Sequence, residues 1–523
     1  MNQRLSDGMI QAVDRQLAAK QSSVSLPGLQ VIRFPQSDRQ HLKSVLRKIN
    51  AGGTKQQEEW ALKTSGSEMK NNREMNMLSG SIFRKLCAIA IPICLSSILQ
   101  QLFNASDTAV VGNFSSSQAM AAVGTNAPVI NVIVTFFSGL SIGSNVMLSS
   151  FIGSGNRDKV NEALHTSFMV ALISGLLMLV LGQVIAQPVL TLLGTPEDVM
   201  GMAVTYLRIY FLGMPFLMIY DFGSSILRAI GDTRRPLLYL TCSGILNVFL
   251  NLFFVIVLHR NADGVAIATT ISNAVSAFLI LRALIREKGM LHLELRHLQL
   301  KTPYLKKILW IGGPAGLQGM IFSVSNVVIQ SAINHFGSAC IAGNSAALNF
   351  EYISYFVVNG FAQAVMTFIS QNYAAGNYVR CRKTTCTAMF CSVGFCAMVS
   401  VSFFLLKAPL LHLFSQQPDV LRYAYVRMTF ITLLEPMTAS YEITGASLRG
   451  IGHSMAPALI TLFGCCGLRV AFIGAMLQRF TSFYQVVLIY PVTWIVTGSA
   501  IIAMYFIVTR KEYRKPETLT VQI

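Results

Sequence analysis

The sequence predicts an all-helical protein that spans a membrane many times. Of its 523 residues, 53 % are hydrophobic and only 12 % are charged, whereas soluble globular proteins carry roughly a quarter charged residues. From about residue 86 onward, long uncharged stretches follow one another, each near the roughly 20 residues that a helix needs to cross a bilayer. The chain also repeats itself, because ILRAIGDTRRP at 226–236 returns as SLRGIGHSMAP at 447–457. Together these observations predict a polytopic all-α membrane protein with two similar halves.

The apolar stretches predict twelve spans, and the charges between them predict an orientation. Lys and Arg gather in alternate connections, for example Arg157 and Lys159 after the second span and Arg234 and Arg235 after the fourth. Because positively charged loops stay in the cytoplasm, we expect a multi-pass protein of the cell membrane with both termini cytoplasmic. This placement also accounts for the net charge of +18 without nucleic acid as a partner. The spans lie near 86–110, 122–150, 163–187, 200–226, 236–258, 262–286, 306–333, 342–370, 384–407, 421–447, 456–478 and 484–509.

The repeat runs through both halves of the chain with an almost constant offset. Arg228, for example, recurs as Arg449, 221 residues later. We therefore expect one six-helix bundle over 81–300 and a second over 301–523, after a cytoplasmic, largely disordered extension over 1–80. An even number of spans per half orients both bundles alike, so their pseudo-twofold axis runs along the membrane normal. A cavity near the midplane and alternating access by rocking are expected of this architecture.

The repeated phrase itself indicates a turn between two helices. Gly231 and Gly452 are expected to end one helix, and Pro236 and Pro457 to lie at the start of the next. We interpret this phrase as scaffold, used once per bundle, and look for the functional site elsewhere.

Five segments, in this order, resemble the MATE family of multidrug and toxic-compound extrusion transporters. They are PICLSSILQQLFNASDTAVVGNF (92–114), AMAAVG (119–124), LRAIGDTRRP (227–236), FISQNYAAGN (368–377) and LRGIGHSMAP (448–457). The resemblance covers roughly 80–510 and is closest to the bacterial branch. It implies a secondary antiporter that exports cationic or amphipathic compounds in exchange for H⁺ or Na⁺, with no cofactor. We expect it to act as a monomer.

Asp107 is the sharpest candidate for the ion-coupling group. An ionisable residue inside a bilayer is costly, so each one is a functional hypothesis by default. The repeat counterpart of Asp107 is Ile329, so the acid belongs to one half only. The alternative is that Asp107 lies close enough to the outer surface to be hydrated and inert. The resemblance implies that Asp107 is the cation-coupling carboxylate of the N-terminal lobe.

Three polar residues of the fifth and sixth spans are candidate partners of Asp107. Asn247 and Asn251 are four residues apart in a predicted helix, so both amides lie on one face; amide bonding between helices is an equally good explanation. The resemblance implies a hydroxyl ligand at Thr269, although Thr270 is an alternative, and it implies Asp where this chain has Asn251. With one carboxylate instead of two, a Na⁺ site would be weaker. We therefore expect H⁺ coupling at Asp107.

The remaining intramembrane charges have two interpretations, one structural and one functional. Asp221 and Glu442 are repeat mates, and each precedes an arginine (Arg228 or Arg449) by seven residues. We expect each acid to pair with that arginine in a structural role.

Deeper in the second half lie two further acids and an arginine. Glu351 in the eighth span and Glu435 in the tenth are candidates to attract a cationic substrate or to move a proton. Arg469 in the eleventh span aligns with Asn247 of the first half. We expect Arg469 to neutralise one of these two acids.

Three functions compete on the sequence alone. Cation-coupled efflux fits the repeat, the isolated Asp107 and the five segments that resemble the MATE family. The alternative is a lipid-linked oligosaccharide or polysaccharide flippase of the same superfamily, which needs a strongly cationic cavity for a pyrophosphate headgroup. An enzyme is the third possibility, but the nearest polar cluster, HRNAD at 259–263, is one short loop. No P-loop occurs either, which excludes a self-contained ATP-driven pump.

Overall fold

The computed structural model divides the chain into two units, Met1–Arg73 and Glu74–Ile523. In the first unit, β1 (Ser23–Val24) pairs antiparallel with β2 (Ile32–Arg33). Apart from these strands and residues 75–80, the extension predicted over 1–80 lies outside the described residues. The residues that the structure describes are 23–24, 32–33, 75–476 and 482–514.

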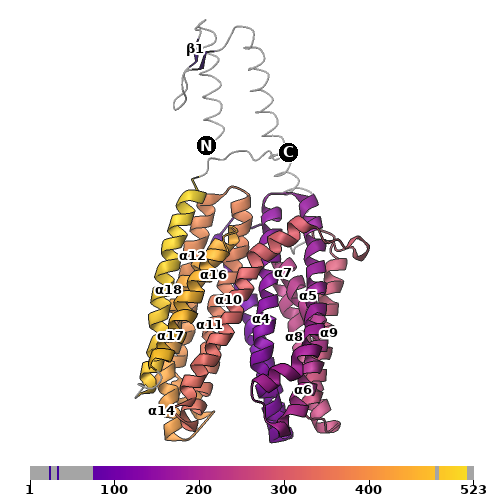
Figure 1. Cartoon of the computed structure of the whole chain (residues 1–523). Coiled ribbons are helices and arrows are strands. Elements are labelled where there is room, and N and C mark those ends of the chain that lie inside the picture. The colour runs from indigo at the N-terminus through magenta and orange to yellow at the C-terminus, as the bar shows by residue number, and fades with distance from the viewer. Residues whose placement is uncertain (1–22, 25–31, 34–74, 477–481, 515–523) are drawn as a thin grey trace. The chain divides into compact units, whose positions relative to one another are not determined.

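Four long helices of the second unit form two pairs of equal length (Figure 1). Helices α3 (Ile82–Phe114) and α10 (Thr302–Asn334) have 33 residues each. Helices α4 (Ser117–Gly153) and α11 (Ser338–Ala374) have 37 residues each. The members of each pair begin 220 or 221 residues apart, as the internal repeat predicts.

The other elements follow in the same order in both halves. The N-terminal bundle continues with α5 (Arg157–Leu192), α6 (Glu197–Leu212), α7 (Met214–Ala229), α8 (Arg234–Leu252), the π-helical turn η2 (Phe253–Val257) and α9 (Ala262–Ile285). A linker with the 3₁₀ turn η3 (Leu295–His297) leads to the C-terminal bundle. After α10 and α11 this bundle contains α12 (Tyr378–Leu405), α13 (Lys407–His412), α14 (Pro418–Arg427), η4 (Met428–Thr432), η5 (Glu435–Thr438), α15 (Ala439–Gly450), α16 (Met455–Thr461), η6 (Leu462–Gly467), α17 (Leu468–Met476) and α18 (Phe483–Glu512).

The all-helical membrane fold is confirmed, but the count of twelve spans is not reproduced exactly as predicted. Among the described residues, ten helices are long and apolar enough to cross a membrane, or eleven when α6 and α7, bent by 44°, count as one. The span predicted at 421–447 lies within α14–α15, where π and 3₁₀ turns interrupt the helix. Pro436 lies at this break, and a proline inside a helix removes a hydrogen bond and clashes with the preceding turn.

The repeated phrase ends a helix in both halves, as predicted. Helix α7 ends at Ala229 and α15 at Gly450, and two residues later Gly231 and Gly452 adopt φ values of +82° and +92°. A side chain rarely tolerates this left-handed conformation, which is why glycine recurs here. Pro236 and Pro457 then lie in the first turns of α8 and α16.

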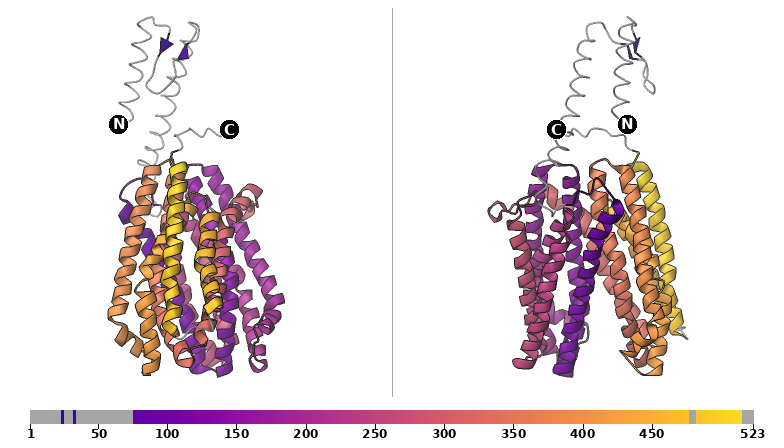
Figure 2. Two further views of the ribbon diagram at one scale, coloured as in Figure 1. Left: turned by 60° about the vertical axis from the view of Figure 1, so that its left-hand side comes forward. Right: turned by 180° about the vertical axis from the view of Figure 1, so that it is seen from behind.

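The hydrophobic core divides between the two bundles, and α3 contributes to both parts. Its first half, including Leu86 and Ile89, packs in the cluster formed mainly by the C-terminal bundle. Its second half, including Val110 and Val111, packs in the cluster of the N-terminal bundle. Figure 2 shows this helix, in indigo, passing from beside the C-terminal helices to beside the N-terminal ones.

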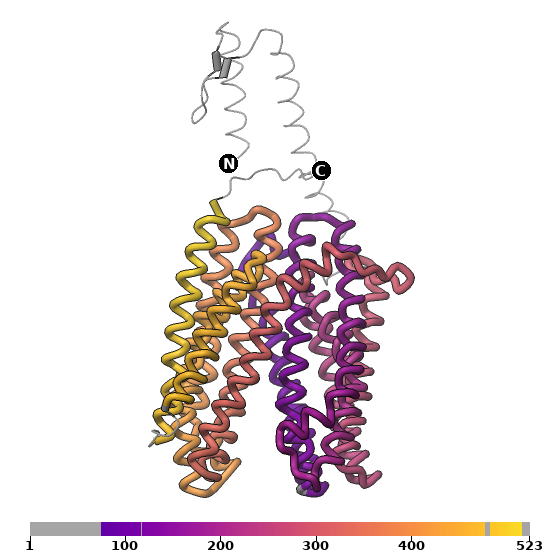
Figure 3. The backbone as a smooth tube through the Cα atoms, in the orientation of Figure 1, coloured from indigo at the N-terminus to yellow at the C-terminus, as the bar shows by residue number. Residues whose placement is uncertain are grey.

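Both bundles have one end rich in cations, here called the basic end; the other is the distal end. The basic end is where α3 begins and α18 ends, and its turns carry Arg157, Lys159, Arg234 and Arg380. The bundles lie close together at the basic end and farther apart at the distal end (Figure 3).

Close approach at the basic end depends on glycines of α4 and α10. A Cβ atom on Gly139 would overlap the backbone of Gly316, and one on Gly143 would overlap the carbonyl oxygen of Ile308 and the backbone of Gly312. Only residues without side chains let two helix backbones approach this closely.

A polar stripe on α11 adds direct hydrogen bonds between the bundles at the basic end. Its members lie on one helix face because they follow the helical spacing. Each bonds to α4 or α7 of the N-terminal bundle: Gln363 accepts from Arg228 (2.5 Å), Thr367 donates to Asn145 (2.9 Å), Ser370 to the carbonyl of Val146 (2.8 Å) and Gln371 to the carbonyl of Ala229 (2.6 Å). We call these four residues the α11 stripe.

Candidate functional site

Asp107 lies in the distal half of α3, facing the inside of the N-terminal bundle. Its side chain is only 9 % exposed. The helix that faces it is α8, and the two helices meet where Gly244 of α8 packs against the ring of Phe103. A Cβ atom on Gly244 would overlap that ring, so the glycine lets α3 approach α8. Asp107 lies one helical turn after Phe103, on the same face of α3, and therefore faces α8 as well.

The structure brings Asp107 together with all three of its predicted partners. Asn251 donates from Nδ2 to Oδ1 of Asp107 at 2.5 Å, and Thr269 donates from Oγ1 to Oδ2 at 3.2 Å. Asn251 also donates to Oδ1 of Asn247 at 3.1 Å, and Asn247 donates to the hydroxyl of Thr269 at 3.3 Å. We call these four residues the Asp107 cluster. Thr270, the alternative to Thr269, instead donates to the carbonyl of Ile209.

The donor set of the Asp107 cluster suits a proton or a hard cation. All its potential ligands are oxygens, which Na⁺ and other hard cations prefer. Oδ1 of Asn251 is buried and has no hydrogen-bond partner among the described residues, so it is free to accept a bond or to bind a cation. A proton on Asp107 would supply the donor that this acceptor lacks. Among the described residues, no group of three or more His, Cys, Asp or Glu side chains could hold a metal ion.

Two tyrosines of α6 complete the surroundings of Asp107. The rings of Tyr206 and Tyr210 stack with centroids 6.1 Å apart, and both hydroxyl groups lie within electrostatic range of Asp107. Neither tyrosine was among the predicted site residues. Their spacing of four residues in an apolar helix was the available signal, but the same spacing is common in packed cores.

The expected pairing of Asp221 and Glu442 with nearby arginines is not seen as a contact, although each acid lies within electrostatic range of its arginine. Asp221 accepts a hydrogen bond from Ser138 of α4 at 2.5 Å, and Glu442 accepts one from Tyr355 of α11 at 3.3 Å. Among the described residues, neither acid forms an ion pair.

The two arginines bind amides instead. Arg228 donates to Gln363 across the bundle interface, and Arg449 donates to Gln318 of α10 at 2.8 Å. Seven residues are about two helical turns, so acid and arginine share a face but are separated along the axis by about 10 Å. The amides of Gln363 and Gln318, on neighbouring helices, lie closer to the two arginines than the acids do.

The neutralising partner of Glu351 is Arg427, not Arg469. Arg427 approaches Oε2 of Glu351 with Nε at 2.9 Å and Nη2 at 2.7 Å, and it donates from Nη1 to Asn344 at 2.6 Å. Arg427 is 2 % exposed, and a buried arginine requires such compensation. Arg427 was not among the predicted site residues, although it lies with Arg422 inside the predicted tenth span, where a cation is the available signal.

Glu435 and Arg469 are both buried, but no ion pair joins them. Arg469 donates from Nε to Thr493 at 3.0 Å and its guanidinium lies 4.3 Å from the ring centroid of Tyr490. Glu435 is 3 % exposed and lies within electrostatic range of Arg469. Oε2 of Glu435 and Nη2 of Arg469 have no hydrogen-bond partner among the described residues. The neutralising role expected of Arg469 is therefore not seen as a contact.

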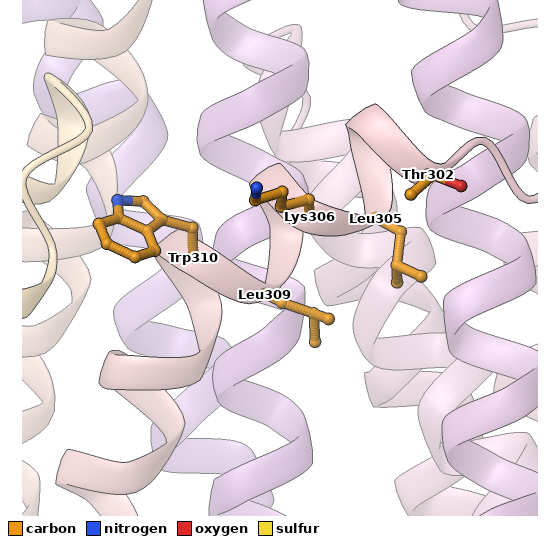
Figure 4. A pocket seen from close by; sticks show the side chains of 5 residues that line it. All are labelled: Thr302, Leu305, Lys306, Leu309 and Trp310. Atoms are coloured by element: carbon orange, nitrogen blue, oxygen red, sulfur yellow. The ribbon is translucent and has the colours of Figure 1, made fainter.

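A hollow on the surface of α10 is separate from all of these groups. It measures about 400 Å³ and is open on one side. Figure 4 shows its lining along the first turns of α10: Thr302, Leu305, Lys306, Leu309 and Trp310. Trp310 is 62 % exposed, and tryptophan with lysine near a helix end is typical of a membrane–water interface.

Comparisons with known proteins agree with this architecture. The sequence model of the MatE family matches residues 92–253 and 314–473, one stretch in each half. The probable multidrug resistance protein YoeA of Bacillus subtilis (strain 168) is 25 % identical over 411 residues, covering 77 % of this chain and 88 % of YoeA. A protein named FAD transporter from Shewanella oneidensis is 26 % identical over 69 % of this chain and 79 % of its own length.

Solved structures of MATE proteins have a similar fold. A crystal structure of MATE in complex with MaL6 superposes with a TM-score of 0.77 at 20 % identity, covering 83 % of this chain and 98 % of that one. Because the family model matches more than half of the residues, in both halves, the chain belongs to the MatE family and is a multi-pass membrane transporter, not an enzyme.

Proposed function

We propose that this protein exports small organic compounds, mainly cationic or amphipathic ones, in exchange for H⁺ across the cell membrane. The observation that carries the proposal is the Asp107 cluster: one buried carboxyl group held by three neutral polar side chains. Such a group changes charge when it binds a proton, and an uncompensated charge is costly in a low-dielectric interior. Relatives named multidrug resistance proteins support the cargo class.

H⁺ is favoured over Na⁺ because the cluster contains a single formal charge. Asn251 lies where a second carboxylate would face Asp107, and its amide donates a hydrogen bond to Asp107 at 2.5 Å. Na⁺ binding at Oδ1 of Asp107 would have to break this bond. A proton needs only the carboxyl group itself and the free acceptor Oδ1 of Asn251.

The transport cycle that we propose is a rocking of the two bundles about the contact at the basic end. With both termini in the cytoplasm, the basic end is the cytoplasmic one, and contacts by the α11 stripe close it. Asp107 lies in the distal half, nearer the external side. The protein acts as a monomer in this scheme, since each chain contains both bundles.

The C-terminal acids are candidates for a second role. Glu435 is buried without a hydrogen-bond partner for Oε2 among the described residues, so it is the better candidate for attracting a cation or moving a proton. Glu351 is neutralised by Arg427 and is better suited to a structural role. Asp221 and Glu442 accept hydrogen bonds from neutral side chains and, together with Arg469, rank between these two.

Flippase activity toward a lipid-linked pyrophosphate is less well supported. Such cargo needs free cationic groups, and the buried arginines of the C-terminal bundle in the described residues are Arg427, Arg449 and Arg469. Arg449 lies at the basic end and is bound to Gln318. Arg427 is neutralised by Glu351, and Arg469 lies within electrostatic range of the acid Glu435.

The coupling ion can be measured directly in proteoliposomes. We expect a cationic dye such as ethidium, added to one side, to drive H⁺ movement in the opposite direction with and without Na⁺ present. A pH-sensitive dye inside the vesicles reports the movement, and vesicles without protein are the control. Ethidium transport that requires Na⁺ and moves no H⁺ would contradict the proposed coupling.

A further inference from the structure

We propose that residues Met75–Gly80, here called the strap, fasten the two bundles together at the basic end and must detach before that end can open. The strap precedes α3 and has no regular secondary structure. It nevertheless contains Met77, whose side chain is fully buried. The inference rests on the proposed rocking of the bundles, but it concerns a segment that takes no part in binding the ion.

The strap is attached to the N-terminal bundle at the turn between α7 and α8. The backbone N–H of Met75 donates to the carbonyl of Ile230 at 3.0 Å. The side chains of Met75 and Met77 pack on Gly231, where a Cβ atom would lie 2.8 and 2.9 Å from them. The repeated phrase therefore has an additional role in this half, because its glycine makes room for the strap.

The strap is also attached to the C-terminal bundle, through α11 and α12. The guanidinium of Arg380 donates to three strap carbonyls, those of Met77 (2.9 Å), Ser79 (2.8 Å) and Gly80 (2.9 Å). Asn372, near the end of α11, donates to the carbonyl of Met77 at 3.3 Å. Arginine suits this task because its planar fork carries five N–H donors in fixed directions.

Bonds to the start of α3 and within the strap itself hold it in this shape. Lys85 of α3 donates from Nζ to the carbonyls of Asn76 and Ser79, the second at 2.7 Å. The side chain of Asn76 accepts from the backbone N–H of Leu78 at 2.9 Å. The strap is thus a preformed bridge between the bundles, and it reinforces the α11 stripe next to it, whose member Gln371 precedes Asn372.

If the basic end opens, the turn at Ile230 and the start of α12 must separate. A strap of six residues cannot keep both sets of bonds during this separation, since its two attachments begin only two residues apart, at Met75 and Met77. The contacts to lose are those with the turn at Ile230, because Arg380 and Lys85 hold the strap beside the start of α3, which packs with the C-terminal bundle. The strap therefore favours the conformation that is closed at the basic end.

Distances between the distal ends of the bundles test the proposal. A ketone-bearing amino acid at Gln118 of α4 and at Ser338 of α11 allows spin labelling that leaves the native cysteines untouched. Rocking that opens the basic end brings these distal positions together. We expect Arg380→Ala to raise the ratio of short to long label distances about tenfold, since a strap that Arg380 no longer fixes must first be ordered to reach Ile230, and this entropy cost falls on the closed state only.

Arg382→Ala is the matched control. Arg382 lies two residues after Arg380 on α12, but its guanidinium lies over the ring of Tyr513 within the C-terminal bundle, so the distances should remain those of the parent. Should Arg380→Ala fail to fold, Met77→Ala, which keeps every strap carbonyl, should shift the distances in the same direction.

Two results would overturn the proposal. One leaves the proposed function intact, and the other also contradicts the proposed transport cycle. If the parent shows two distances that respond to pH but Arg380→Ala has the parent's ratio, the strap has no such role and the proposed function stands. If neither the parent nor any variant shows a second distance at any pH, the rocking itself is absent, and the strap and the transport cycle fall together.

Discussion

Asp107 and Asn251 form the contact from which the coupling chemistry follows. An aspartate at position 251 would place two carboxylates side by side, and the added charge would favour a bound Na⁺. We therefore expect Asn251→Asp to make ethidium transport in proteoliposomes increase with Na⁺, whereas the parent is unaffected. Asn251→Ala, which adds no charge, is the control. Equal Na⁺ responses in the parent and in Asn251→Asp would show that charge at this position does not select the ion.

The ion pair of Glu351 and Arg427 allows a second test at the level of single residues. Glu351→Gln leaves a buried guanidinium uncompensated, which costs about 3–5 kcal/mol. We expect a clearly lower midpoint of thermal unfolding in detergent, and a smaller loss in the double variant Glu351→Gln/Arg427→Met, because the charge is then removed. Asp419→Asn, at an exposed site, is the control. A double variant that loses as much as the sum of both single changes would contradict this coupling.

The sequence was a good guide to the N-terminal site and a poorer one to the C-terminal charges. Asp107, Asn247 and Asn251 could be grouped because helical spacing places the two amides on one face and the family resemblance supplies the acid. Partners such as Arg427 for Glu351, or Gln363 for Arg228, come from helices far apart in the chain. No local spacing predicts which of two neighbouring helices presents the nearer polar atom.

The contact between α4 and α10 is the main interface that glycines permit. Gly139→Ala would force a methyl group against the backbone of Gly316, and overpacking of this kind costs about 1–3 kcal/mol. We expect a lower midpoint of thermal unfolding. Gly313→Ala is the matched control, since no atom lies within 4 Å of a Cβ there and alanine favours a helix by about 0.5–1 kcal/mol over glycine. Equal midpoints for both variants would show that close packing at Gly139 contributes little.

The elements could largely be predicted from the repeat, with one physical exception. Equal lengths of α3 and α10, and of α4 and α11, follow from matching sequences. The span predicted at 421–447 is broken at Pro436, which cannot donate the backbone hydrogen bond that a continuous helix requires. Hydropathy averages over such a break and gives no sign of it.

At the scale of the whole molecule, two similar bundles are joined more firmly at one end than at the other. The α11 stripe, the glycine contacts of α4 and the strap all lie at the basic end. The sequence predicts two halves, but it does not predict that α3 packs its first half against one bundle and its second half against the other. That arrangement places Asp107 beyond the contact between the bundles, on the side of the distal end.

Proton-driven accumulation of a cargo tests the central claim most directly. Proteoliposomes with the parent or with Asp107→Asn receive the same imposed pH gradient, and the concentration of ethidium inside is followed over time. The parent should concentrate ethidium against its gradient and lose it when an ionophore collapses the pH difference. Asp107→Asn, equally abundant and equally stable, should at most equilibrate the dye, because an amide cannot exchange a proton. Ethidium accumulated by Asp107→Asn to the parent's level would contradict the account.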